Sequence, residues 1–396
     1  MGNVNTLGRA FRLTAAGESR AFYEGEKLRS EIISAIVDGC PAGLPLSEED
    51  IQPDMDRRKP GQSKVTTSRK EDDIVTIHSG VYTSLSGVHK GKTTGAPILL
   101  TIKNTKTSTP DDPEYALYKE FPRPGHADMV YDLKYGGFQN PVHGGRASAR
   151  TLGAAVVMGG GVAKKLLRYT FGTEILAHTI RIEKIRAEPV QINESNIMEY
   201  KELAEKNKVR CLDAEAAVEM ENAIEKAKNE KDSVGGFVEV VATKVPQGLG
   251  EPLFGKLRAD LALNLYSINA VCDVHFGIGP MFAEMRGSEV LESYKLKGGK
   301  VVPVKNYFGG MEGGISTGAP IVAKVYFHPT YSIPWEVDTV NLRKKEEVRR
   351  QVVPEGAKHD PCIVPRAIPI VEAMVALALA DHGIISGYIE RVLGEN

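Results

Sequence analysis

Cysteine is scarce in this chain, and neither sign of charge is in excess. The four cysteines, Cys40, Cys211, Cys272 and Cys362, lie far apart without CxxC or zinc-type spacing. This favours reduced thiols in a reducing compartment over a disulfide framework or a structural metal site. The formal net charge of −1 gives no long-range field for nucleic acid or an anionic membrane, so any specificity for anions must be local.

Long hydrophobic runs are also missing from the sequence. The N-terminal stretch MGNVNTLGRAFRLT lacks the apolar core of a secretory signal, and no window approaches the roughly 18 apolar residues of a membrane span. We therefore expect a cytoplasmic protein that binds neither membranes nor nucleic acid.

Short apolar runs separated by glycine-rich turns predict strands, and a few longer periodic segments predict helices. β-Branched residues bounded by Gly, Pro or Asn predict strands within 73–87, 96–105, 235–246 and 319–329. Apolar periodicity predicts helices over 148–171, 213–232 and 365–382, the second of them capped by Asp213.

The order of these elements indicates the fold class. Strands and helices do not alternate regularly, which favours an α+β fold over a doubly wound parallel sheet. The charged stretch 341–351 is most simply a solvated face or loop. No convincing linker is visible, so we expect residues 1–396 to form a single domain.

Basic and hydroxyl residues flanked by glycine form clusters of the kind that bind phosphate groups. In DMDRRKPGQSK, Arg57, Arg58 and Lys64 surround a Pro-Gly turn, although a solvated basic loop would have the same composition. In GGRASAR, Arg146 and Arg150 stand at the start of a long apolar helix, whose free N–H groups favour an anion. Capping of that helix by its serine is the alternative.

Two further clusters carry groups that could exchange protons. In RPGHADMVYDLKYG, a Pro-Gly turn presents His126, although a lone histidine more often has a structural role. In KHDPCIVPRAIPIVEAM, Asp360 precedes a predicted helix and could equally cap it or pair with a neighbour. HExxH and P-loop motifs are absent, which gives no support to metalloprotease or NTPase chemistry.

Taken in order, these clusters and several other segments resemble the chorismate synthase family. The resemblance is carried by GES, VDGCPAGLPL, DRRKPGQS, GKTTGAPI, RPGHAD, KYG, GGRASAR, SVGGFVEVVA, GLGEPLF, SINAV, GGISTG and HDPCIVPRAIPIVEAM. It implies a sandwich of antiparallel β-sheets wrapped by α-helices, assembled as a homotetramer. The implied reaction is the 1,4-elimination of phosphate from 5-enolpyruvylshikimate 3-phosphate to give chorismate, with reduced FMN and no net redox change.

The resemblance also implies catalytic roles for three residues. His126 matches the histidine that protonates or stabilises reduced flavin, and Asp360 matches the aspartate near flavin N5 that passes the substrate proton away. Arg20 stands where the family has the histidine of GESHG, which protonates or stabilises the leaving phosphate. An arginine neutralises phosphate charge, but its pKa above about 12 prevents proton donation at neutral pH.

Binding roles are implied for a larger set of positions. The flavin would contact Arg146, Ala147, Ser148, Asn269, Ala270, Gly313, His328, Pro329, Thr330, Tyr331, Ser332 and Lys358. The anionic substrate, or NADPH in members that reduce their own flavin, would contact Ser19, Arg57, Arg58, Lys64 and Arg150.

Several positions depart from the family pattern. His328 replaces a lysine of the flavin-phosphate segment, Lys358 replaces an arginine, and Ala155 replaces an arginine on the helix after GGRASAR. The changes lower the local positive charge, so weaker binding of FMN or substrate is one hypothesis. A non-catalytic flavin-binding or assembly protein on the same fold is therefore the alternative to a working enzyme.

Overall fold

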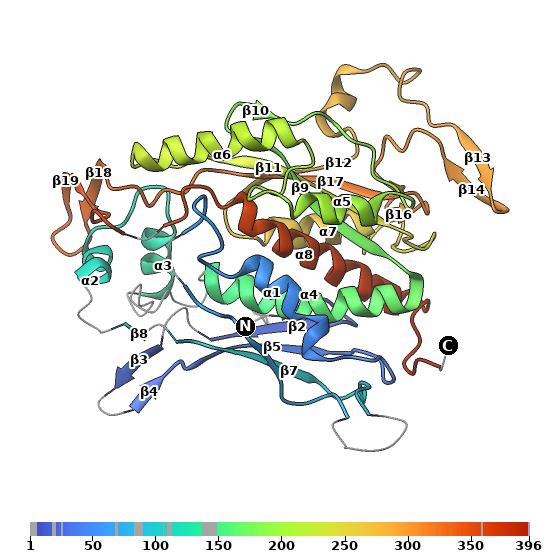
Figure 1. Ribbon diagram of the computed structural model, residues 1–396, viewed down its shortest axis with the longest axis horizontal. Coiled ribbons are helices and arrows are strands. Elements are labelled where there is room, and N and C mark those ends of the chain that lie inside the picture. Colours follow the sequence, from blue (N-terminus) through green and yellow to red (C-terminus); the bar gives the residue numbers. More distant parts are fainter. Residues whose placement is uncertain are drawn as a thin grey trace.

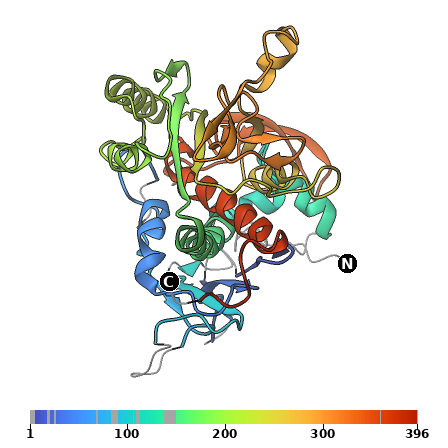
Figure 2. The same cartoon turned by 90° about the vertical axis from the view of Figure 1, so that its right-hand side faces the viewer.

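Two five-stranded antiparallel sheets lie on either side of two long helices, α4 (Ala149–Phe171) and α8 (Val364–Ile385) (Figures 1 and 2). α4 packs against the first sheet, α8 packs against the second, and the two helices pack on each other. This computed structural model describes residues 6–17, 21–24, 27–67, 70–82, 90–105, 107–108, 113–136, 149–357 and 359–394. The α+β class and the antiparallel sheets expected from the sequence are thus confirmed.

The strands of the two sheets come from separate parts of the chain. The first sheet has the order β1 (Thr6–Leu7), β2 (Arg12–Ala16), β5 (Ile32–Asp38), β7 (Ile98–Lys103) and β6 (Val75–Ile77). The second has the order β10 (Ile185–Arg186), β9 (Glu174–Ile182), β11 (Gly236–Thr243), β17 (Ile321–Phe327) and β12 (Val271–Phe276).

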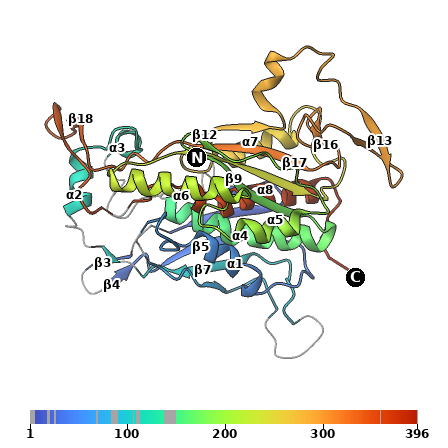
Figure 3. The same cartoon turned by 45° about the horizontal axis from the view of Figure 1, so that its top comes forward.

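The remaining elements surround this core. The other helices are α1 (Gln52–Arg58), α2 (Pro113–Glu120), α3 (Asp128–Tyr135), α5 (Ile197–Ala204), α6 (Ala214–Asn229) and α7 (Leu257–Tyr266), with 3₁₀ turns at Glu48–Asp50 and Gly279–Glu284. Small sheets are formed by β3 (Ala21–Glu24), β4 (Lys27–Arg29) and β8 (Thr107–Ser108), and by the pairs β13 (Tyr294–Lys297) and β14 (Lys300–Pro303), β15 (Met311–Glu312) and β16 (Ile315–Ser316), and β18 (Glu336–Asn341) and β19 (Glu346–Gln351). The β13–β14 and β18–β19 hairpins extend at opposite ends of the molecule (Figures 1 and 3).

Local sequence explains why these segments form their elements. In β17, residues alternate between buried and partly buried positions, as expected for a strand with one face on the core. The predicted cap of α6 is confirmed, because the carboxylate of Asp213 accepts hydrogen bonds from the backbone N–H groups of Glu215 and Ala216.

Of the two alternatives expected for the charged stretch 341–351, a solvated face is the one observed, because the stretch forms the turn and second strand of the β18–β19 hairpin and most of it is exposed or partly exposed. The expectation that no segment approaches the length and apolarity of a membrane span was wrong. α8 does contain an 18-residue window that is long and apolar enough to span a membrane, with a mean hydropathy of 1.7. That window is 83% buried inside the protein, however, as expected for a helix that packs between two layers of the core.

Glycine permits the close crossing of α4 and α8. A Cβ atom placed on Gly160 would lie 2.2 Å from the Cβ of Ala373 and 2.6 Å from its Cα. The backbones therefore approach more closely than any side chain at Gly160 would allow, and this contact joins the two central helices.

A buried ion-pair network ties the same helices to α1. Glu372 on α8 accepts from Arg57 Nη1 at 2.7 Å and from Lys164 Nζ on α4 at 2.6 Å, and also from the backbone N–H of Ala177 at 3.0 Å. Burial by itself would raise the pKa of Glu372, but the charges of Arg57 and Lys164 hold it well below its usual value. The carboxylate is therefore ionised throughout the neutral range.

We expect Gly160→Ala to lower the melting temperature by several degrees. The added methyl group forces α4 and α8 apart, and overpacking of a core typically costs about 1–3 kcal/mol, more than the gain of about 1 kcal/mol from replacing a helical glycine by alanine. Gly287→Ala is the matched control, because a Cβ there meets nothing within 4 Å. Equal melting temperatures for the two variants would contradict the close crossing.

We expect Glu372→Gln to lower the free energy of unfolding by about 3–5 kcal/mol near pH 7, because it removes the most buried carboxylate from Arg57 and Lys164 and leaves both cations to share Asp54. Since the folded-state pKa of Glu372 lies below the unfolded value of about 4.3, the deficit is complete above that pH and shrinks as the pH falls below it. Urea unfolding at several pH values measures this dependence. Glu355→Gln, which removes an exposed partner of Lys231, should leave the urea unfolding curve unchanged at any pH.

Candidate active site

Asp360 lies just before α8, with a hydrogen-bond donor on each of its carboxylate oxygens. The backbone N–H of Thr67 donates to Oδ1 at 2.8 Å, and Arg366 Nη1 donates to Oδ2 at 2.5 Å. Ile363 is the N-cap of α8 and has no side-chain cap. Of the two structural roles considered for Asp360, pairing with a neighbour is therefore the one observed.

Two guanidinium groups hold Asp73, and a third joins them to Asp360. Arg58, in the last turn of α1, donates to Asp73 Oδ2 at 3.2 Å and to the carbonyl oxygen of Arg150 at 3.0 Å. Arg150, in the first turn of α4, donates to Asp73 Oδ1 at 2.8 Å and also pairs with Glu71. Arg366 Nε donates to the carbonyl oxygen of Arg58 at 3.2 Å, which joins this group to Asp360.

Arg58 is a buried cation whose charge its surroundings disfavour. Burial, together with the nearby charge of Arg366 and to a lesser extent that of Arg150, lowers the pKa of Arg58 to about 9, although Asp73 opposes the shift. Arg58 thus remains charged at neutral pH. Three carboxylates, those of Asp73, Glu71 and Asp360, accompany the three guanidinium groups.

Two buried polar atoms in this region have no hydrogen-bond partner among the described residues. They are Arg150 Nε and Ser63 Oγ, from the first turn of α4 and from the loop after α1. Buried donors without partners are rare in folded proteins. These two could therefore bind a ligand that carries acceptor oxygens.

His126 belongs to a second charged group, which Asp128 organises. Arg123 Nε donates to Asp128 Oδ2 at 2.7 Å and its Nη2 to Oδ1 at 2.8 Å, while His126 Nδ1 lies 2.8 Å from Oδ1. Burial would raise the pKa of Asp128, but the hydrogen bonds from Arg123 and His126 hold it well below its usual value. The ionised carboxylate fixes the imidazole, whose side chain remains 38% exposed.

The segment His328–Ser332 connects these two charged groups. Arg123 Nη1 donates to Ser332 Oγ at 2.9 Å, and Thr330 Oγ1 donates to the carbonyl oxygen of Asp360 at 3.1 Å. Gly125 has φ +75°, and a Cβ there would lie 3.0 Å from the ring of Tyr331. The His126 turn therefore fits directly against this segment.

Ala270 lies at the other end of the same segment. The N–H of His328 donates to the carbonyl oxygen of Ala270 at 3.1 Å, and the rings of His328 and Tyr331 stack with centroids 4.4 Å apart. Ala270 has φ +66°, a left-handed conformation that is uncommon outside glycine, in the turn between α7 and β12. The structure thus brings Asp360, Arg58, Arg150, His126, His328–Ser332 and Ala270 into one connected region.

Other residues expected at the site lie elsewhere or have different partners. Arg57 belongs to the ion-pair network of Glu372, with further pairs to Asp54 and Glu205. Gly313 is in the turn between β15 and β16, at the opposite end of the molecule from α3 (Figures 1 and 3).

The last group of expected residues has no described geometry. Ser19, Arg20, Arg146, Ala147, Ser148 and Lys358 lie outside the described residues. Lys64, in contrast, belongs to the described residues, and its carbonyl oxygen accepts a hydrogen bond from Lys228 Nζ at 3.1 Å.

The sequence analysis missed several residues that build this region. Arg123 and Arg366 stand inside quoted motifs, RPGHAD and PRAIP, and their basic side chains beside a turn and a helix start were the available signal. Glu71 and Asp73 gave no comparable signal, because an acidic pair in a polar stretch is usually solvated.

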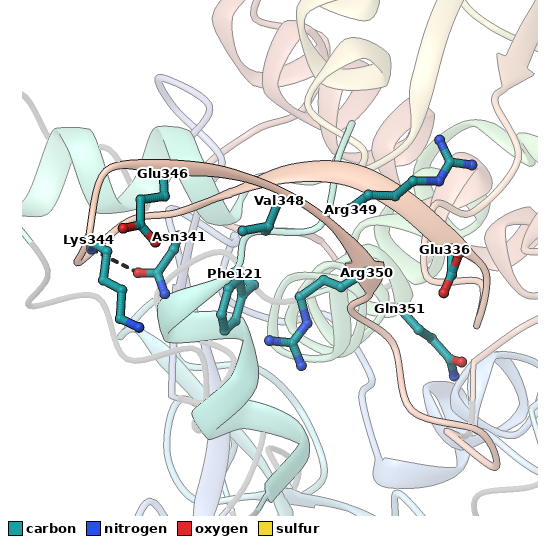
Figure 4. A pocket seen from close by; sticks show the side chains of 9 residues that line it. All are labelled: Phe121, Glu336, Asn341, Lys344, Glu346, Val348, Arg349, Arg350 and Gln351. Atoms are coloured by element: carbon teal, nitrogen blue, oxygen red, sulfur yellow. Dashed lines mark hydrogen bonds between the residues drawn. The ribbon is translucent and has the colours of Figure 1, made fainter.

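A separate hollow of about 530 Å³ lies beside the β18–β19 hairpin (Figure 4). Its lining residues are Phe121, Glu336, Asn341, Lys344, Glu346, Val348, Arg349, Arg350 and Gln351. Arg350 lies over the ring of Phe121, 4.0 Å from its centroid. None of the residues expected at the active site lines this hollow, so it is distinct from the region around Asp360.

Comparison with known proteins identifies the family. The model of the family described as "Chorismate synthase" matches residues 11–384. Proteins named chorismate synthase from Methanopyrus kandleri and Methanocaldococcus jannaschii are each 46% identical to this chain, over 98% of it and over 94% and 98% of their own lengths. A crystal structure of chorismate synthase superposes with a TM-score of 0.71 at 30% identity, covering 96% of this chain and 93% of that one. The chain belongs to the chorismate synthase family.

Proposed function

We propose that this protein converts 5-enolpyruvylshikimate 3-phosphate to chorismate by 1,4-elimination of phosphate, with reduced FMN. Membership of the family supports the reaction, and the connected region around Asp360 supports the location of the site. The observation that carries most weight is that His126 and Asp360, the two proton-exchanging residues, are linked through His328–Ser332.

The described residues fit the anionic ligands of this reaction. The substrate carries two carboxylates and a phosphate, and FMN carries a phosphate, so both need several cationic and neutral donors. Arg58 and Arg150 supply buried guanidinium groups, and Arg150 Nε and Ser63 Oγ are donors without a partner among the described residues. The hydroxyl groups of Thr330 and Ser332, in the segment expected at the flavin phosphate, add neutral donors.

Each residue group then has a distinct task. Bound reduced FMN supplies the electron density that makes departure of phosphate feasible. Arg58 and Arg150 hold and orient the substrate anions, which replaces solvation by fixed donors. Asp360 takes up the proton that leaves the substrate, and His126, fixed by Asp128, exchanges a proton on the flavin side of the site. Arg20 neutralises the departing phosphate without donating a proton.

Several broader features complete this proposal. We expect residues 1–396 to act as one domain, a homotetramer to be the working assembly, and the cytoplasm to be its location. NADPH is a candidate source of reducing equivalents for the flavin, and an external reductant is the other. Retention of His126, Asp360 and Arg58 supports an active enzyme over a protein that only binds flavin.

Asp360→Asn should lower kcat by about a hundredfold to ten-thousandfold, because the amide cannot accept the substrate proton. The measurement is anaerobic formation of chorismate from 5-enolpyruvylshikimate 3-phosphate with photoreduced FMN. Asp338→Asn, which removes an 82% exposed carboxylate from the β18–β19 hairpin, is the control and should leave the rate unchanged. Absence of turnover by the parent protein, folded and saturated with FMN, would refute the proposed function.

Arg20→His should raise kcat in the same assay, because a histidine can donate a proton to the leaving phosphate near neutral pH. Arg20→Ala should lower kcat, since it removes the charge without supplying a donor. A lower rate in Arg20→His than in the parent would mean that the permanent charge of arginine matters more than proton donation.

A further inference from the structure

Arg366 contacts both Asp360 and the loop that follows α1. Its Nη1 donates to Asp360 Oδ2 at 2.5 Å, and its Nε donates to the carbonyl oxygen of Arg58 at 3.2 Å. Arg366 stands in the first turn of α8, on a helix that is packed between two layers of the core. The guanidinium group therefore has a rigid support.

Thr67 completes the arrangement from the other side. Its backbone N–H donates to Asp360 Oδ1 at 2.8 Å, so the carboxylate is held between Thr67 and Arg366. The pair Asp360–Arg366 thereby contacts both ends of the loop between Arg58 and Thr67, because Arg366 binds the carbonyl oxygen at its start and Asp360 binds the N–H at its end. A carboxylate with one donor on each oxygen has a single favoured orientation. A carboxylate with only one donor could still rotate about its side-chain bonds.

The surroundings of Arg366 argue against a purely stabilising role. Its side chain is only 17% exposed and that of Asp360 15%, so both charges are largely removed from water. The guanidinium group also lies close enough to Arg58 to disfavour the charge of that residue. A third arginine beside two others is costly in a buried site, and its compensating contact is with the one carboxylate that the reaction requires.

We propose that Arg366 is the positioning residue for Asp360, which keeps the carboxylate turned between Thr67 and the start of α8. The catalytic consequence rests on the proposed function, in which Asp360 accepts the substrate proton. The position of the carboxylate does not rest on the proposed function, and it can be examined without measuring turnover.

The kinetic test compares the parent with Arg366→Ala and Arg366→Lys. We expect kcat of Arg366→Ala to fall by about a hundredfold, the effect expected when a reacting group is displaced by about 1 Å. KM should change by less than about threefold, because Arg366 acts through Asp360. Millimolar guanidinium should restore part of the activity of Arg366→Ala, and Arg366→Lys should retain part of it. Arg168→Ala removes another arginine–carboxylate pair, with Glu174, and should change neither constant nor respond to guanidinium.

The structural test uses crystal structures of the parent and of Arg366→Ala, with thermal melting as a check that both are folded. A carboxylate of Asp360 that has rotated away from Thr67 in the variant supports the proposal. A carboxylate that keeps its orientation in Arg366→Ala overturns it, whatever the turnover. If the parent makes no chorismate, the proposed function fails, and the two crystal structures still decide the role of Arg366.

Discussion

The crossing of α4 and α8 sets the geometry on which the site depends. Both helices begin at the same end of the core, with Arg150 in the first turn of one and Arg366 in the first turn of the other (Figure 1). Gly160 allows α4 to approach Ala373 closely, and the two helix starts are joined through Arg58, which binds the carbonyl oxygen of Arg150 and whose own carbonyl oxygen binds Arg366. α1 packs against both helices and adds Arg58. The spacing of the three guanidinium groups thus follows from backbone packing well away from them.

The charge of this region is a local property that the whole chain does not share. The chain as a whole is almost neutral, yet Arg58, Arg150 and Arg366 lie within one connected group. The positive ends of α4 and α8 point to the same place, which adds to the field of the side chains. Asp73, Glu71 and Asp360 pair with these arginines, so the cations are held in fixed positions by carboxylates. Because the cations converge on one site instead of lining a surface, the region suits a small anion better than a long polyanion.

The sequence predicted the elements better than the partners within the site. Regular apolar periodicity identified α4 and α6, and the Pro-Gly turns marked the loop that carries His126 and the end of α1 at Arg58, because such signals are local. Arg57 and Arg58 are adjacent in sequence but have different partners, since successive side chains on a helix point in directions about 100° apart. One pairs with Glu372 and the other with Asp73. Neither partner could be predicted, because each comes from a distant segment that only the folded chain brings close.

The pairing of the arginines also indicates which of them could bind an additional anion. Arg123 donates to both oxygens of Asp128 and to Ser332, and it lies over the ring of Tyr118 at 4.1 Å from its centroid. An anion that recruited Arg123 would have to displace a buried carboxylate, which is costly. Arg150 differs, because its Nε has no partner among the described residues while its other nitrogens hold Asp73 and Glu71. It could therefore accept a ligand oxygen without losing an existing pair, so the first turn of α4 is the part of the described region best prepared for substrate or cofactor.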